Sequence, residues 1–287
     1  MLRGGKQMYK IGLSSCGKNF DRELFEGYSK SGITEIEISL RSYDDFNYKE
    51  AYTFSKNYGV NIWSLHLPFV PFGLIEISSM DKTLRESSIN RFSEIIPKAA
   101  EIGIDKFVIH PSGEPIPDID REERMKNAKD SLSKIADVCE KNGAVLCVEN
   151  LPRTCLGHSI EEMKELLADD GRLKMCFDTN HIKVQKPEDI ILAMADRIVT
   201  LHVSDFDYID ERHWLPGEGK IDWKALLNAL SQIGYKGAFM YELGYACPKT
   251  IVRDRNLTPD DFVKNANELL SGTDITVISS PNPELGM

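Results

Sequence analysis

Eight short apolar runs with β-strand character alternate with amphipathic helical runs, and this alternation is the strongest constraint on the fold of the chain. The candidate strands are Lys10–Ser15, Glu35–Leu40, Asn61–Pro68, Lys106–Pro111, Ala144–Asn150, Leu173–Thr179, Ile198–Asp205 and Gly237–Leu243. Strands that alternate with helices form parallel sheets, either open and doubly wound or closed into a (β/α)8 barrel. The segment after the first strand lacks a GxGxxG phosphate loop, and the count of eight favours the barrel.

The helical segments contain recognisable start signals, and the composition does not change between the two halves of the chain. Ser159 and Glu162, for example, have the spacing of a capping box at the start of a helix. We therefore predict one α/β domain, a single (β/α)8 TIM barrel. The predicted division is an N-terminal extension at residues 1–8, the barrel at residues 9–270 and a weakly structured C-terminal tail at residues 271–287.

The composition of the 287-residue chain is typical of a soluble globular protein, with 41% hydrophobic and 28% charged residues. No apolar run approaches the ~20 residues that cross a bilayer, and the basic start of the chain lacks the apolar stretch of a secretory signal. The six cysteines form no CxxC pair, so we expect free thiols and a cytoplasmic location. The net charge of −10 disfavours a broad nucleic-acid surface, and we expect neither a nucleic-acid nor a membrane partner.

Six successive candidate strands end on ionisable side chains. In chain order these are His66, His110, Glu149, Asp178 with His181, His202 with Asp205, and Glu242. One such residue alone is more often a core histidine, a helix cap or a turn residue. In a (β/α)8 barrel, however, the carboxyl ends of all strands meet at one mouth. Several acids would repel one another strongly there, and a divalent metal ion removes that difficulty.

Three acids and one histidine of this ring are suited to a metal site. The candidate ligands are Glu149, Asp178, His202 and Glu242. Three carboxylates and one imidazole fit Mn²⁺, Mg²⁺, Co²⁺ or Zn²⁺, and the oxygen-rich set favours the harder ions. We expect one divalent ion per chain, with Mn²⁺ preferred.

The strand ends resemble those of the xylose isomerase-like TIM barrel superfamily, particularly its sugar phosphate isomerases and epimerases. The matching stretches are HLP, IHPSGEP, VENLPR, FDTNH, LHVSD, RHWLPGEGKIDW and YEL, and the resemblance covers nearly the whole chain. It implies that the four candidate ligands hold the metal, and that Glu149 and Glu242 exchange a proton with opposite faces of a sugar. The candidate substrate-binding residues are His66, His110, His181, Arg212 and His213.

The implied chemistry is carbohydrate isomerisation or epimerisation through an enediolate. A hydroxyl and a carbonyl on adjacent carbons chelate the metal, which stabilises the enediolate as a Lewis acid. One carboxylate removes the proton from carbon, and an acid returns it. Return to the same carbon gives an epimer, and return to the neighbouring carbon gives an isomer. Dehydration of an inositol-type ketone begins with the same step, so the sequence leaves the outcome open, together with the sugar and its phosphorylation.

Two alternatives belong to other classes. Apurinic endonucleases of the endonuclease IV type, in the same superfamily, use histidine-rich clusters of three zinc ions, and the histidines of this chain fall where theirs fall. Residues Glu211 to His213 read ERH, close to the Asp-Arg-His of that group, and Glu149 would then bridge metals. The acidic charge and the lack of an evident basic insertion disfavour this interpretation. A non-catalytic barrel would have lost one of the four ligands, and none is lost. We expect a small-molecule sugar as the partner and allow for a homo-oligomer.

Overall fold

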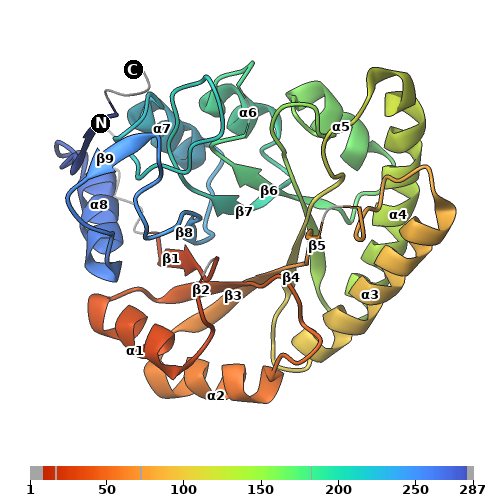
Figure 1. The fold of residues 1–287 in the computed structure, drawn as a ribbon, viewed down its shortest axis with the longest axis horizontal. Helices are drawn as coiled ribbons and strands as arrows, with labels where there is room; N and C mark the ends of the chain where they lie inside the picture. Colours follow the sequence, from red (N-terminus) through yellow and green to blue (C-terminus); the bar gives the residue numbers. More distant parts are fainter. Residues whose placement is uncertain (1–8, 17, 72, 182, 283–287) are drawn as a thin grey trace.

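The strands form a barrel at the centre of the molecule with helices around it (Figure 1), in a computed structural model that describes residues 9–16, 18–71, 73–181 and 183–282. The barrel strands are β1 (Ile11–Ser14), β2 (Glu35–Ser39), β3 (Asn61–His66), β4 (Lys106–Ile109), β5 (Val145–Glu149), β6 (Lys174–Asp178), β7 (Ile198–His202) and β8 (Phe239–Tyr241). The helices are α1 (Arg22–Ser31), α2 (Tyr48–Tyr58), α3 (Lys82–Ala100), the 3₁₀ turn η1 (Asp118–Asp120), α4 (Arg121–Lys141), α5 (Ile160–Ala168), α6 (Pro187–Ala193), α7 (Trp223–Gln232) and α8 (Pro259–Ser271).

All eight strands are parallel neighbours in the order β7-β6-β5-β4-β3-β2-β1-β8. The two ends of this order meet where Val203, the residue after β7, bridges Tyr241, the last residue of β8, in parallel. The amide of Val203 donates to the carbonyl of Met240 at 2.8 Å, and the amide of Glu242 donates to the carbonyl of Val203 at 3.1 Å. The predicted single-domain (β/α)8 TIM barrel is therefore confirmed, and each predicted strand contains one observed strand.

The C-terminal part of the chain adds one small sheet to the barrel. After β8, the strand β9 (Ile251–Arg253) pairs antiparallel with β10 (Ser279–Pro281), so part of the described tail is paired with the segment between β8 and α8. The extension at residues 1–8 lies outside the described residues, and the division at residue 270 stays a prediction. Among the described residues, no helix has both the length and the apolar character that a membrane span requires.

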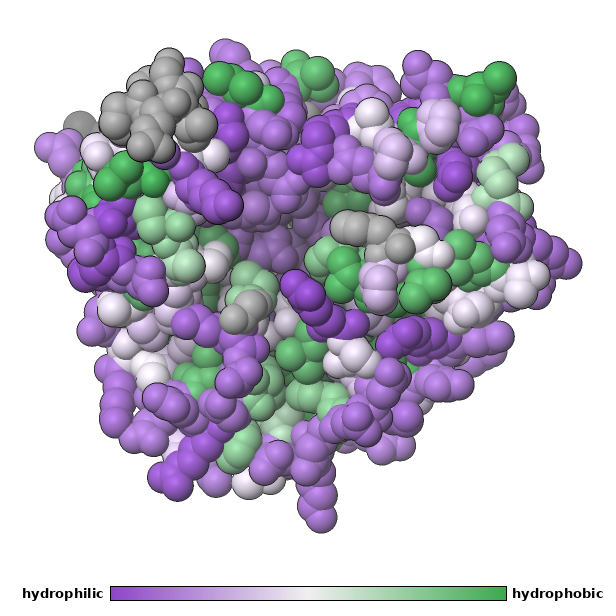
Figure 2. All heavy atoms as spheres, in the orientation of Figure 1, coloured by the Kyte–Doolittle hydropathy of each residue, from purple (hydrophilic) through white to green (hydrophobic). Residues whose placement is uncertain are grey.

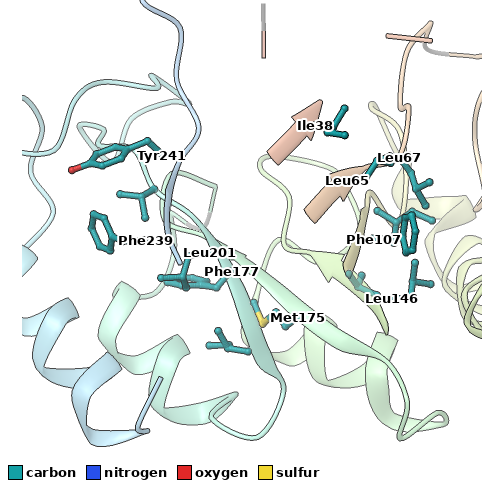
Figure 3. Close-up of a cluster of buried hydrophobic side chains, with 14 of the residues drawn as sticks. Ile38, Leu65, Leu67, Phe107, Leu146, Met175, Phe177, Leu201, Phe239 and Tyr241 are labelled. Atoms are coloured by element: carbon teal, nitrogen blue, oxygen red, sulfur yellow. The ribbon is translucent and has the colours of Figure 1, made fainter. Parts of the chain in front are cut away.

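Side chains of the barrel strands alternate between two environments, as strand geometry requires. On β6, Met175 and Phe177 lie in the large apolar cluster that also includes helix residues, whereas Cys176 lies in a small separate cluster with Val108 and Cys147. Figure 3 shows ten labelled side chains of the large cluster, drawn from several strands. Burying each of these side chains stabilises the fold by about 1.5–3 kcal/mol. The apolar contacts therefore lie mainly on the outer face of the barrel, between strands and helices, and the barrel interior can accommodate polar groups.

An ion pair between Arg121 and Glu162 ties the start of α4 to the start of α5. The hydroxyl of Ser159 caps α5 by accepting from the amide of Glu162 at 3.3 Å, as predicted. The other half of the predicted capping box is replaced, because the Glu162 carboxylate accepts from the amide of Gly157 at 2.9 Å and from Arg121 at 2.6 and 2.7 Å. Burial would raise the pKa of Glu162, but His158 and Arg121 lower it to about 2.

We expect the Arg121→Gln substitution to lower the free energy of unfolding at pH 7 by about 1–3 kcal/mol, because it leaves a half-buried carboxylate without its guanidinium. The pKa of Glu162 is about 2 in the folded protein, below the ~4.3 of an unfolded glutamate. The stabilisation is therefore complete above about pH 4.3 and is lost as the pH falls towards 2. Denaturant unfolding at pH 7 and pH 3 should show the difference between variant and wild type shrinking in acid.

The control is Lys126→Gln on the same helix, whose partner Glu122 is 87% exposed. Exposed pairs contribute little, so its unfolding midpoint should match that of the wild type at both pH values. Equal losses in the two variants would contradict the assigned role of Arg121.

Candidate active site

The four candidate metal ligands converge at the carboxyl ends of neighbouring strands. Glu149, Asp178 and His202 are the last residues of β5, β6 and β7, and Glu242 directly follows β8. Each offers a ligand atom, and these atoms lie within 4.8 Å of one another. The first three are fully buried, and the side chain of Glu242 is 14% exposed. Nδ1 of His202 lies 3.1 Å from Glu149 Oε1 and 3.0 Å from Glu242 Oε2.

A side-chain amide fixes the position of Asp178 relative to Glu149. Asn150, the residue after Glu149, donates from Nδ2 to the carbonyl of Asp178 at 2.9 Å and accepts from its amide at 2.8 Å. These two bonds continue the β5–β6 ladder past the last strand residues. The motif VEN therefore supplies both a ligand and the residue that aligns the next ligand.

The donor set fits a divalent cation. Among the described residues, Oδ2 of Asp178 is buried and has no hydrogen-bond partner. Burial, together with Glu149 and Glu242, raises the pKa of Asp178 to about 7 against the opposing effect of His181. A carboxylate oxygen that is buried, unpartnered and close to two other acids is suited to metal coordination.

Glu149 lies between two groups of histidines. Its Oε1 faces His202 at 3.1 Å and His181 at 3.5 Å, whereas its Oε2 faces Nε2 of His66 at 3.1 Å and Nε2 of His110 at 3.3 Å. Burial would raise the pKa of Glu149, but His202 and His110 hold it well below its ordinary value. His66, His110 and Glu149 form a second group with metal-ligand spacing, so Glu149 belongs to two such groups.

A third group with ligand spacing consists of His181, Glu211 and His213. Oε1 of Glu211 lies 2.7 Å from Nε2 of His213 and 3.7 Å from Nε2 of His181. Burial opposes the charge of Glu211, but the two imidazoles lower its pKa far below the ordinary value. The sugar-enzyme interpretation of the sequence gave Glu211 no role, and the structure places it with two of the candidate substrate-binding histidines.

A cavity of about 360 Å³ opens onto these groups. Its lining includes Glu149 and Glu242, with His110, His181 and His213. Figure 2 shows a hollow lined by hydrophilic residues near the centre of the viewed face. The ring of Phe69 stacks on that of His110 with their centroids 4.3 Å apart and forms an apolar part of the wall.

Two arginines near the mouth are already paired with acids. Arg153 contacts Glu114 at 2.7 Å, Glu211 at 2.8 Å and Asp210 at 3.3 Å, which links the loops after β4, β5 and β7. Arg212 pairs with Asp207 at 2.9 Å and is not among the residues that line the cavity. A substrate contact by Arg212 stays a prediction, as do the substrate contacts of the four histidines.

The comparison with known families agrees with this geometry. Residues 25–262 match the family model described as "Xylose isomerase-like TIM barrel", which is most of the chain. The chain belongs to this family. A solved structure of a "D-tagatose 3-epimerase-like protein" has a TM-score of 0.74 and 24% identity, and the match covers 92% of this chain and 96% of that one. That likeness shows the fold.

Among the curated sequences similar to this family member, some are uncharacterized and the others name one of two activities. "Probable endonuclease 4" of Thermoplasma acidophilum is 26% identical over 187 residues, covering 58% of this chain and 62% of the relative. "Inosose isomerase" of Bacillus velezensis is 24% identical over 187 residues, covering 61% of this chain and 66% of the relative. The chain thus spans less than two thirds of the length of the curated relatives it matches.

In this xylose isomerase-like barrel, Asp205 shapes the loop that contains the PGEGKIDW motif. Its Oδ2 accepts from the amide of Gly217 and from Nε1 of Trp223, both at 2.8 Å. Its Oδ1 accepts from the amides of Phe206 at 2.8 Å and Ile221 at 3.2 Å. Asp205 is fully buried, and its four bonds all come from N–H donors, so they depend on a carboxylate, which only accepts. The motif therefore has a structural role beside the site.

We expect Asp205→Asn to lower the free energy of unfolding by about 2–4 kcal/mol. The asparagine amide replaces one carboxylate oxygen with an NH₂ group, so the N–H groups that bonded this oxygen lose their acceptor and face another donor. Denaturant unfolding followed by tryptophan fluorescence measures this change. The control is Asp222→Asn, at the N-cap of α7, where the side chain accepts from the amide of Ala225 at 3.0 Å. Asparagine caps helices as well as aspartate, so the control should keep wild-type stability. Similar stability of both variants would contradict this role of Asp205.

Proposed function

We propose that the protein is a divalent-metal-dependent isomerase or epimerase of a sugar, and that it uses carboxylate proton transfer. The proposal rests chiefly on the position of Glu149 and Glu242. Both contact His202 within the candidate metal group, and both line the same cavity. A sugar held in that cavity would have a carboxylate within reach of its reacting carbon. The names of the solved epimerase and the curated isomerase support the same class.

The candidate ligands Glu149, Asp178, His202 and Glu242 would hold the metal, for which Mn²⁺ stays our preference. When bound, the ion supplies Lewis-acid polarisation of a substrate carbonyl. Glu149 and Glu242 are the acid and base. Burial opposes ionisation of Glu242, but His202 lowers its pKa to about 2, and the pKa of Glu149 is also held low. Both are therefore ionised at neutral pH before substrate binds. In isomerisation, one carboxylate accepts the proton from one carbon and its protonated form returns it to the neighbouring carbon, whereas epimerisation also requires the second carboxylate to take a proton from solvent and deliver it to the opposite face.

The charges at the mouth favour a sugar without a phosphate group. Arg153 lines the cavity, but its guanidinium already contacts three carboxylates. No lysine among the described residues lines the cavity, whereas Glu114 and Glu211 do. A phosphate group would have to compete with these acids for Arg153 and would be repelled by them.

We expect turnover of an active ketose in D₂O to place deuterium on the reacting carbon. Glu242→Gln removes a proton-transfer group, so its exchange rate should fall by about 10²–10⁴-fold. The assay is NMR or mass spectrometry of a panel of free ketoses incubated with Mn²⁺-loaded protein. Glu123→Gln, an exposed site on α4, is the matched control and should exchange at the wild-type rate. Complete turnover without deuterium would indicate a shielded proton or a hydride shift and would remove both glutamates from the proposed role.

A second candidate is a multi-metal phosphodiesterase of the endonuclease IV type. Three groups with metal-ligand spacing favour it, since Glu149 joins the first two and Glu211 completes the third. The name of the archaeal relative also supports it. The acidic mouth argues against it, because duplex DNA is bound largely through phosphate contacts to lysine and arginine.

Metal stoichiometry separates the two candidates. In a single-metal sugar enzyme, His110 is not a ligand, so we expect His110→Gln to keep a ratio near one metal per chain, while Asp178→Asn loses it. In a three-metal nuclease, His110→Gln removes a direct metal bond, and metal content should fall from an initial three. Elemental analysis of protein purified without chelator provides the ratio, and nicking of abasic duplex DNA is measured in parallel. Three metals together with nicking by the wild type would overturn the sugar-enzyme proposal.

A further inference from the structure

A buried carboxylate outside the ligand groups contacts the histidine of the candidate metal site. Glu37 lies on β2 and is fully buried. Its Oε1 lies 3.0 Å and its Oε2 3.1 Å from Nε2 of His202. Oε2 also accepts from the hydroxyl of Ser64 on β3 at 2.7 Å. Among the described residues, neither a lysine nor an arginine forms an ion pair with Glu37, so His202 is its ionisable partner.

The two ring nitrogens of His202 therefore face different groups. Nε2 faces Glu37, whereas Nδ1 faces Glu149 at 3.1 Å and Glu242 at 3.0 Å. A neutral imidazole has one N–H donor and one lone pair, and an ionised carboxylate only accepts. A hydrogen bond to Glu37 thus places the proton on Nε2 and leaves the lone pair of Nδ1 directed at the ligand group.

The geometry points to Glu37 as the positioning residue of the metal site: it holds the His202 ring in the orientation and tautomer in which Nδ1 binds the metal. This role rests on the proposed metal site. Carboxylates that accept from the outer nitrogen of a metal-binding histidine fix its tautomer and make it a stronger ligand. Ser64 in turn orients Glu37, so the arrangement reaches from β3 through β2 to β7.

A matched residue on the same strand separates this role from a general effect of buried charge. Glu35 lies two positions earlier on β2, so its side chain is on the same face as that of Glu37. It is 1% exposed and contacts Lys10 at 2.9 Å and Asn61 at 2.7 Å. It has no contact with His202. Glu35→Gln and Glu37→Gln therefore remove the same charge from the same strand, and only the second affects the candidate ligand.

The test is a titration of the metal-free full chain with Co²⁺, followed by calorimetry and by the visible absorption of the bound ion. We expect Glu37→Gln to raise the Kd about 10- to 100-fold and to change the Co²⁺ spectrum, because a neutral amide holds the ring less firmly and can also donate to it. Glu35→Gln should keep the wild-type Kd and spectrum, even if it lowers the melting temperature. Equal Kd values for the two variants would overturn the inference.

A second measurement does not depend on affinity. In Zn²⁺-loaded protein with ¹⁵N-labelled histidine, the Nε2 proton of His202 should resonate far downfield, since it donates to a carboxylate. We expect this resonance in the wild type and in Glu35→Gln, and an upfield shift in Glu37→Gln. A wild-type spectrum with the metal on Nε2 would overturn the inference. Failure of the proposed function would appear differently, as a chain that binds Co²⁺ but exchanges no sugar proton. The Kd values of the two variants for Co²⁺ would still decide the role of Glu37.

Discussion

The buried carboxylate of Glu149 is the group on which the rest of the site depends. It is fully buried at the end of β5, yet each of its oxygens faces two histidines. An ionised carboxylate loses several kcal/mol of hydration on burial, so it is tolerated only where positive charge compensates it. Asp178 and Glu242 add two more acids within ligand distance. The imidazoles at the same strand ends compensate part of this concentration of negative charge, and a divalent cation is the kind of group that would compensate the rest.

The barrel supplies this arrangement through the two-residue period of its strands. On β5, Leu146 and Val148 belong to the apolar cluster shared with the helices, whereas Cys147 belongs to the small interior cluster that precedes Glu149. The outward side chains supply the apolar contacts that stabilise the fold, so the inward side chains need not be apolar. Polar groups can therefore occupy the interior near the mouth, as Glu37 does on β2, without a loss of apolar contacts between strands and helices.

The sequence allowed the fold and the convergence of the four candidate ligands to be predicted, because both follow from regular patterns. Once eight strands are parallel and closed, the residues at their ends, such as Glu149 and Asp178, must share one mouth. Side chains on irregular loops could not be placed in this way: the pairing of Arg212 with Asp207 does not follow from strand geometry, and the substrate contact implied for Arg212 stays a prediction. Glu37 was missed although a signal exists, since the strand sequence EIEIS places acids on one face of a strand that a closed barrel covers on both faces.

The orientations of the histidine rings around Glu149 link the number of bound metal ions to the number of protons on those rings. Nδ1 of His66 lies 2.8 Å from the carbonyl of Leu67, which only accepts, so Nδ1 is protonated and Nε2 faces Glu149. Nε2 of His202 faces the carboxylate of Glu37, which also only accepts, so this Nε2 is protonated and Nδ1 faces Glu149. Burial would lower the pKa of both rings, but Glu149 raises the pKa of His66, and Cys176, with Glu242 and Glu37, raises the pKa of His202. Each nitrogen that faces Glu149 must therefore hold a proton or a metal ion. An ion that binds one of these nitrogens displaces its proton, so a single-metal site leaves His66 protonated and a three-metal site does not.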